Sequence, residues 1–134
     1  MQSTQSAPVP KKRLWSARVI TGVAALFLLF DSIIKVIKLA PAVQGTTQLG
    51  YPANVVVGIG IVELVCLVVY VIPSTSVLGA ILLTGYLGGA VATHVRVGSP
   101  LFSHVLFPMY LGALVWGGLF LRDDRLRALI PLRR

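Results

Sequence analysis

The chain has 134 residues, which is enough for one compact domain; 56% of them are hydrophobic and only 12% are charged. A water-soluble domain of this size needs roughly a quarter charged residues, so the mean hydropathy of +0.87 indicates an integral membrane protein. The net charge of +8 gathers at the two ends of the chain, where it indicates membrane topology. No basic face with interleaved aromatic residues is present, so we expect no nucleic-acid partner.

The N-terminal part consists of a basic tail and an apolar segment. We predict that residues 1–17 form a disordered cytoplasmic tail and that the first transmembrane helix extends from about Arg18 to Leu39. Basic residues followed by an apolar run and an Ala-Pro-Ala triplet (40–42) also occur in signal peptides. However, Asp31, Lys35 and Lys38 separate the run from the triplet, and a charged spacer of this length favours a retained helix.

Three further apolar segments follow, each near the ~20 residues that a bilayer core requires. They are residues 53–72, 77–95 and 103–121, and we interpret residues 40–52 as a loop because of its prolines and glycines. Short connections make neighbouring helices antiparallel. The predicted fold is all-α: residues 18–121 form an up-down-up-down four-transmembrane-helix bundle, and residues 122–134 form a basic cytoplasmic tail.

Basic residues are more frequent beside the two termini than on the opposite side of the predicted bundle. Nine flank the termini, namely Lys11, Lys12, Arg13, Arg18, Arg122, Arg125, Arg127, Arg133 and Arg134. Arg96, with Lys35 and Lys38 at a helix end, lies on the other side. The positive-inside rule therefore places both termini in the cytoplasm.

Ionisable side chains within the apolar segments form a candidate polar cluster. A rise of ~1.5 Å per residue places Asp31 ~18 Å, Lys35 ~24 Å, Glu63 ~14 Å and His94 ~26 Å from the inner boundary. All four lie between the midplane and the outer rim, and Asp31 and Lys35 share one face of their helix. We predict an outward-opening pocket with Asp31 and Glu63 at its floor, Lys35 and His94 in its wall, and His104 near its mouth.

The same residues have other interpretations. Asp31 and Lys35 could only neutralise each other, and Lys35 and Lys38 could extend to the outer headgroups. Glu63 has no charged neighbour in sequence, so it must be protonated or paired across helices. The histidines also suggest zinc or haem, but zinc requires three or four ligands and only His94 and His104 are candidate nitrogens, so we predict no metal.

Glycines concentrate on the third segment, at Gly85, Gly88 and Gly89. Small residues let membrane helices approach closely, so we predict that this helix is the packing centre. We expect these glycines to pack against other helices of the same chain, with packing between two copies of the chain as the alternative.

No sequence motif indicates a catalytic site. The chain lacks GxSxG, GxxxxGK[ST] and a GxGxxG that follows a strand, and its one cysteine, Cys66, excludes a CxxC motif. These absences favour a protein that is not itself an enzyme, with a subunit associated with an oxidoreductase as the alternative, and we predict no catalytic residue.

At the family level, residues 83–131 (LTGYLGGAVATHVRVGSP and onward) resemble the second half of the DoxX-like family of small bacterial membrane proteins. The earlier stretches DSIIKVIKL, LGYP and GIVELVCLVVYVIP resemble the first half, so the likeness covers about residues 18–131. It implies four transmembrane helices and a bacterial inner-membrane location. Relatives are associated with thiosulfate:quinone oxidoreduction and with redox-stress complexes, and more distant ones resemble chaperones.

The leading hypothesis is an accessory subunit of a membrane redox or stress-response complex, whose pocket holds a quinone-like or lipid-like molecule. In it, Lys35 and His94 bind the polar head, while Asp31 and Glu63 set their charge. Candidate partners are the bilayer and a membrane or peripheral redox protein. The alternative is a non-catalytic chaperone or packing protein that docks a helix on the glycine-rich third segment. A small transporter ranks third, because four helices are few for alternating access.

Overall fold

The computed structural model describes residues 10–129, which form helices and the turns between them. Four helices are long and apolar enough to cross a membrane, and in three of them the span includes the short helical turn that precedes the long helix. The long helices are α1 (Lys11–Val36), α3 (Val56–Val71), α4 (Ser76–Arg96) and α5 (Phe107–Arg122), and the short ones are α2 (Ala40–Gln48) and α6 (Asp124–Leu129). The tail residues 1–9 and 130–134 lie outside the described residues.

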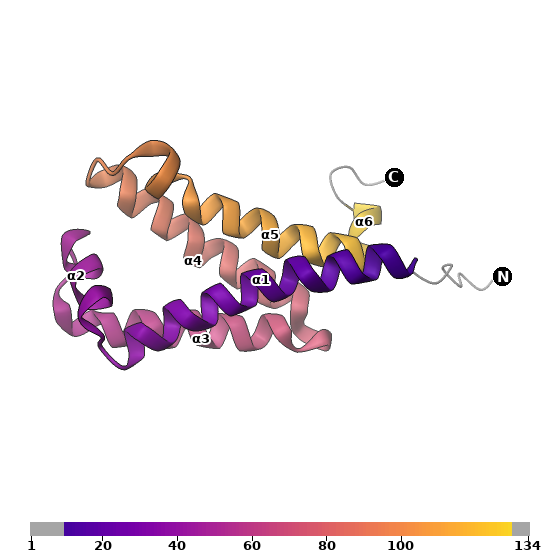
Figure 1. Ribbon diagram of the computed structural model, residues 1–134, viewed down its shortest axis with the longest axis horizontal. Coiled ribbons are helices and arrows are strands. Elements are labelled where there is room, and N and C mark those ends of the chain that lie inside the picture. The colour runs from indigo at the N-terminus through magenta and orange to yellow at the C-terminus, as the bar shows by residue number, and fades with distance from the viewer. Residues whose placement is uncertain (1–9, 130–134) are drawn as a thin grey trace.

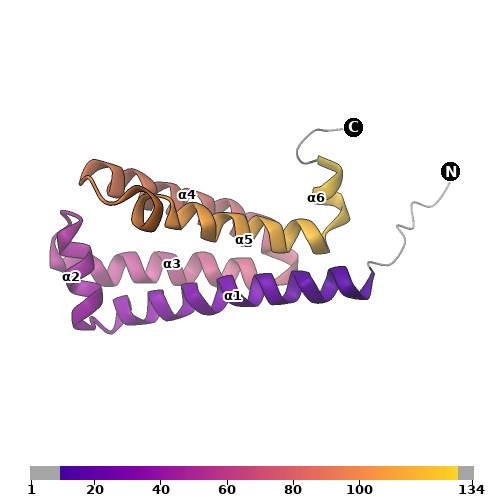
Figure 2. The same ribbon diagram turned by 45° about the horizontal axis from the view of Figure 1, so that its top comes forward.

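The four long helices form one bundle in which consecutive helices run in opposite directions (Figure 1). α1 packs against α3 and α5, and α4 packs against the same two helices. α6 and the beginning of α1 lie at one end, which we call the terminal end, and α2 lies at the other, the α2 end (Figure 2).

The surface of the bundle is that of a membrane protein. Large apolar side chains face outward along the spans, with Leu26 69% and Phe30 66% exposed. The core is narrow and consists of residues such as Leu28, Leu83 and Val115. Since water would not tolerate so much exposed apolar surface, a lipid bilayer is the environment that fits this molecule.

Two predicted boundaries differ from the structure. α1 begins at Lys11, seven residues before the predicted start, because Ala17 is fully buried where Gly118 of α5 packs against it. The predicted loop 40–52 contains helix α2, because Pro41 stands in the first helical turn, where its missing N–H costs nothing. Thr46 also donates its hydroxyl to the carbonyl of Ala42, at 2.8 Å.

The prediction that Gly85, Gly88 and Gly89 form the packing centre of the bundle is wrong. A Cβ atom built on any of the three meets no atom within 4 Å, so they lie on the outer face of α4. The close approaches occur instead at Gly60, Gly79 and Gly118. At Gly79 a Cβ atom would overlap the backbone of Tyr70, which is why only glycine fits between α3 and α4 there.

We predict that Gly79→Ala lowers the melting temperature in detergent, because the added methyl group forces α3 and α4 apart at a cost of about 1–3 kcal/mol. Gly85→Ala is the matched control on the same helix, and it should leave the melting temperature unchanged or slightly higher. Equal losses in the two variants would contradict the assignment of Gly79 to the contact.

Candidate functional site

Lys35 joins three other side chains into one polar cluster inside the bundle. Its Nζ donates hydrogen bonds to Asp31 Oδ2 at 2.5 Å, Glu63 Oε2 at 3.0 Å and the Tyr86 hydroxyl at 2.8 Å. The Tyr86 hydroxyl in turn donates to Glu63 Oε2 at 2.9 Å. We call Asp31, Lys35, Glu63 and Tyr86 the lysine cluster; it connects α1, α3 and α4.

The packing of α1 on α3 positions this cluster. A Cβ atom at Gly60 would overlap Lys35 Cβ, so the missing side chain of Gly60 lets α1 approach α3 closely. Glu63 lies nearly one turn further along α3, and a helical side chain points back toward the N-terminus of its own helix. The Lys35 ammonium group therefore extends from near the end of α1 to the level of Glu63.

The cluster carries unbalanced charge in a region without water. The Glu63 side chain is 1% exposed, Lys35 16% and Asp31 30%. With both carboxyl groups ionised, two negative charges face one ammonium group, so a proton or a further positive partner is needed for neutrality. Glu63 Oε1 is also buried and has no hydrogen-bond partner among residues 10–129. The cluster therefore holds an unused acceptor.

The two histidines form a separate pair at the α2 end. His94 lies eight residues beyond Tyr86 on α4, a rise of ~12 Å, and its Nδ1 is 3.0 Å from the Ser99 hydroxyl. His104 pairs with the Ser103 hydroxyl, and the two imidazole rings are 5.8 Å apart. The described residues contain no group of three or more histidine, cysteine or acidic side chains arranged to hold a metal ion. This pair therefore lacks the third ligand that zinc requires.

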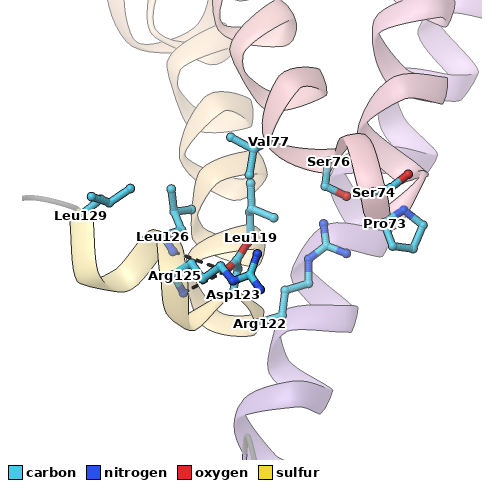
Figure 3. A pocket seen from close by; sticks show the side chains of 10 residues that line it. All are labelled: Pro73, Ser74, Ser76, Val77, Leu119, Arg122, Asp123, Arg125, Leu126 and Leu129. Atoms are coloured by element: carbon cyan, nitrogen blue, oxygen red, sulfur yellow. Dashed lines mark hydrogen bonds between the residues drawn. The ribbon is translucent and has the colours of Figure 1, made fainter. Parts of the chain in front are cut away.

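The outward-opening pocket predicted from the sequence is not among the surface hollows found at the terminal end of the bundle. Cluster side chains bond to one another directly, and the Asp31 side chain is more exposed than those of Lys35 and Glu63. Two surface hollows lie at the terminal end, and no residue of the lysine cluster lines either of them. The larger one, between the α3–α4 turn and the end of α5, is shown in Figure 3.

Tyr86 is the one member of the lysine cluster that is not among the residues predicted from the sequence. Counting residues from the turn between the second and third spans would have identified it. Glu63 lies nine residues before Ile72, Tyr86 lies nine residues after Val77, and the two helices meet at the turn between them. The phenol and the carboxylate are therefore at the same depth on neighbouring antiparallel helices.

The comparisons with known proteins give one match. A family model described as "DoxX-like family" matches residues 19–118, which is most of the chain and includes the whole lysine cluster. No curated protein and no solved structure matches the chain.

We predict that Lys35→Met destabilises the bundle by about 3–5 kcal/mol, because it leaves the buried Glu63 carboxylate without its cation. The double variant Lys35→Met with Glu63→Gln should recover much of the loss, since it removes the unpaired charge. Unfolding free energies in mixed micelles measure both effects. Additive losses from the two substitutions would show that the two groups are not coupled.

Proposed function

This chain belongs to the DoxX-like family of membrane proteins, and we propose that it is an accessory subunit of a redox or stress-response complex of the bacterial inner membrane. In this proposal both termini are cytoplasmic, and a quinone-like or lipid-like molecule binds at the lysine cluster. The observation that carries it is the buried, unpartnered Glu63 Oε1 beside a partly exposed Asp31.

The lysine cluster offers both hydrogen-bond donors and acceptors to a polar head. Lys35 and Tyr86 donate their N–H and O–H groups within the cluster, so in this proposal a quinone carbonyl oxygen takes the place of one of those acceptors. Glu63 Oε1 is free to accept from a quinol hydroxyl group. The bound molecule would supply the redox chemistry, while this chain would bind and orient it and hold a proton at a carboxyl group.

The exposure of Asp31 indicates how a ligand would enter. Asp31 lies in the membrane-spanning part of α1, so its exposed edge faces the bilayer rather than water. Phe27, one helical turn before it, is 38% exposed, and its ring centroid is 5.2 Å from that of Phe107 on α5. A carboxylate beside exposed aromatic rings suits an amphipathic molecule dissolved in the membrane, and a ligand there would also cover a costly lipid-facing charge.

We expect Tyr86→Phe to weaken the binding of a short-chain ubiquinone probe about tenfold, because one donor to the head is lost. Quenching of tryptophan fluorescence in nanodiscs measures the affinity. Tyr110→Phe is the matched control: it removes a hydroxyl that bonds to the Phe102 carbonyl, away from the cluster.

Glu63→Gln tests the same site through the acceptor, and the fold should persist because glutamine keeps the shape of the side chain. Weaker probe binding with an unchanged melting temperature supports the proposal. If Glu63→Gln sharply lowers the melting temperature, and neither Glu63→Gln nor Tyr86→Phe alters probe binding, the cluster only stabilises the fold and the proposal fails.

One observation favours the second function, a chaperone or packing protein. Gly85, Gly88 and Gly89 face outward with open space beside them, so a partner helix can approach α4 closely at this face. In this case the protein has no ligand, and the lysine cluster only holds the bundle together.

For this second function we predict that Gly88→Leu abolishes recovery of a membrane partner with the tagged protein, while leaving its own melting temperature unchanged. Gly58→Leu is the matched control, because Gly58 on α3 also has open space beside it. Quantitative mass spectrometry of the complex purified from native membranes measures recovery. Equal recovery in both variants would exclude docking at this face.

A further inference from the structure

A hollow at the terminal end contains an arginine whose donors are not used. Its volume is about 490 Å³, and it lies where the α3–α4 turn, the end of α5 and α6 meet. Figure 3 shows the guanidinium group of Arg122 directed toward Pro73 and Ser76 on the opposite side of this hollow. Arg122 Nε and Nη2 are both buried and have no hydrogen-bond partner among residues 10–129. Buried guanidinium donors without an acceptor are costly, which indicates that an acceptor binds there.

Each of the two carboxylates nearest to this arginine in sequence bonds another group through its Oδ1 atom, and one of them, Asp123, also lines the hollow. Asp123 Oδ1 accepts the backbone N–H groups of Arg125 and Leu126, at 2.9 and 3.3 Å, and so caps α6. Asp124 forms a salt bridge with Arg13 at 2.7 Å. Among the described residues the terminal end carries seven basic side chains and these two acidic ones: Lys11, Lys12, Arg13, Arg18, Arg122, Arg125 and Arg127 against Asp123 and Asp124. The excess charge is positive, so the missing acceptor is an anion.

The fold holds Arg122 in place. Its guanidinium carbon lies 5.6 Å from the centre of the Tyr70 ring, within the range of a cation–π contact. Tyr70 is fully buried and donates its hydroxyl to the Val115 carbonyl at 2.8 Å. A guanidinium group fixed over an aromatic ring presents its edge donors in a set direction, and this planar fork matches the oxygens of a phosphate.

The depth of the hollow agrees with such a ligand. Pro73 is the first residue of one span and Arg122 is the last residue of another, so the hollow lies at a membrane–water interface. Lipid phosphates lie at this depth, and Val77, Leu126 and Leu129 give the hollow an apolar side. We propose that this hollow binds a phosphate group, carried by an anionic phospholipid or by soluble phosphate, with Arg122 as its main ligand.

The test uses the full chain in zwitterionic nanodiscs, with phosphatidylglycerol and inorganic phosphate as probes. We expect Arg122→Gln to weaken the binding of one probe about tenfold or more, because a charge-assisted pair is lost. Lys12→Gln is the matched control: it removes the same charge at the same end but does not line the hollow, and binding should change little.

The two probes identify the source of the phosphate. Loss of phosphatidylglycerol binding alone identifies a lipid site, and loss of phosphate binding identifies a soluble ligand. Equal weakening by Arg122→Gln and Lys12→Gln, or no binding of either probe, overturns the proposal. If Arg122→Gln does not fold, Ser74→Leu replaces it: Ser74 is exposed and lines the hollow, so a larger side chain should block binding without unfolding the bundle.

Discussion

The attraction between one ammonium group and two carboxylates within the bilayer is the constraint on which this structure depends. A charge in hydrocarbon is tolerated only when it is paired, and Lys35 is the partner of both Asp31 and Glu63. The pairing fixes the rotation of α1 about its axis and its height against α3. Tyr86 adds α4 to the same set of contacts, so three of the four spans are held in register by one nitrogen atom.

The polar groups of the bundle lie in three separate regions that differ in charge and in residue type. The lysine cluster lies within the spans and has two carboxyl groups for one ammonium group, whereas the terminal end has an excess of basic side chains. The α2 end carries the histidine pair, and there Arg96 donates to the carbonyl of Leu49 at 3.1 Å and so ties α4 to the end of α2. A ligand for the cluster and a ligand for the Arg122 hollow would therefore occupy separate sites.

The features that depend on local spacing or bilayer thickness could be predicted from the sequence. The spans follow from apolar length, the Asp31–Lys35 pair from one helical turn, and the need of Glu63 for a partner from the cost of a lone carboxylate. What could not be predicted depends on rotation about the helix axes. GxxxG spacing marks a small face on α4 but does not say whether it faces a neighbour, and here the contact is made by Gly79 instead. His94 was grouped with the cluster for a similar reason, because depth alone does not determine contacts.

The pairing of Lys35 with Glu63 has a consequence for how the protein enters the membrane. A carboxylate at the centre of an isolated span costs about 2.5–3.5 kcal/mol on insertion scales, and α3 carries Glu63 in its middle. That cost is removed only when α1 is already beside it, with Gly60 against Lys35. We therefore expect the translocon to release α1 and α3 together as a hairpin, with α2 as the short connection between them. Biogenesis of the first half of the chain would then be a single step.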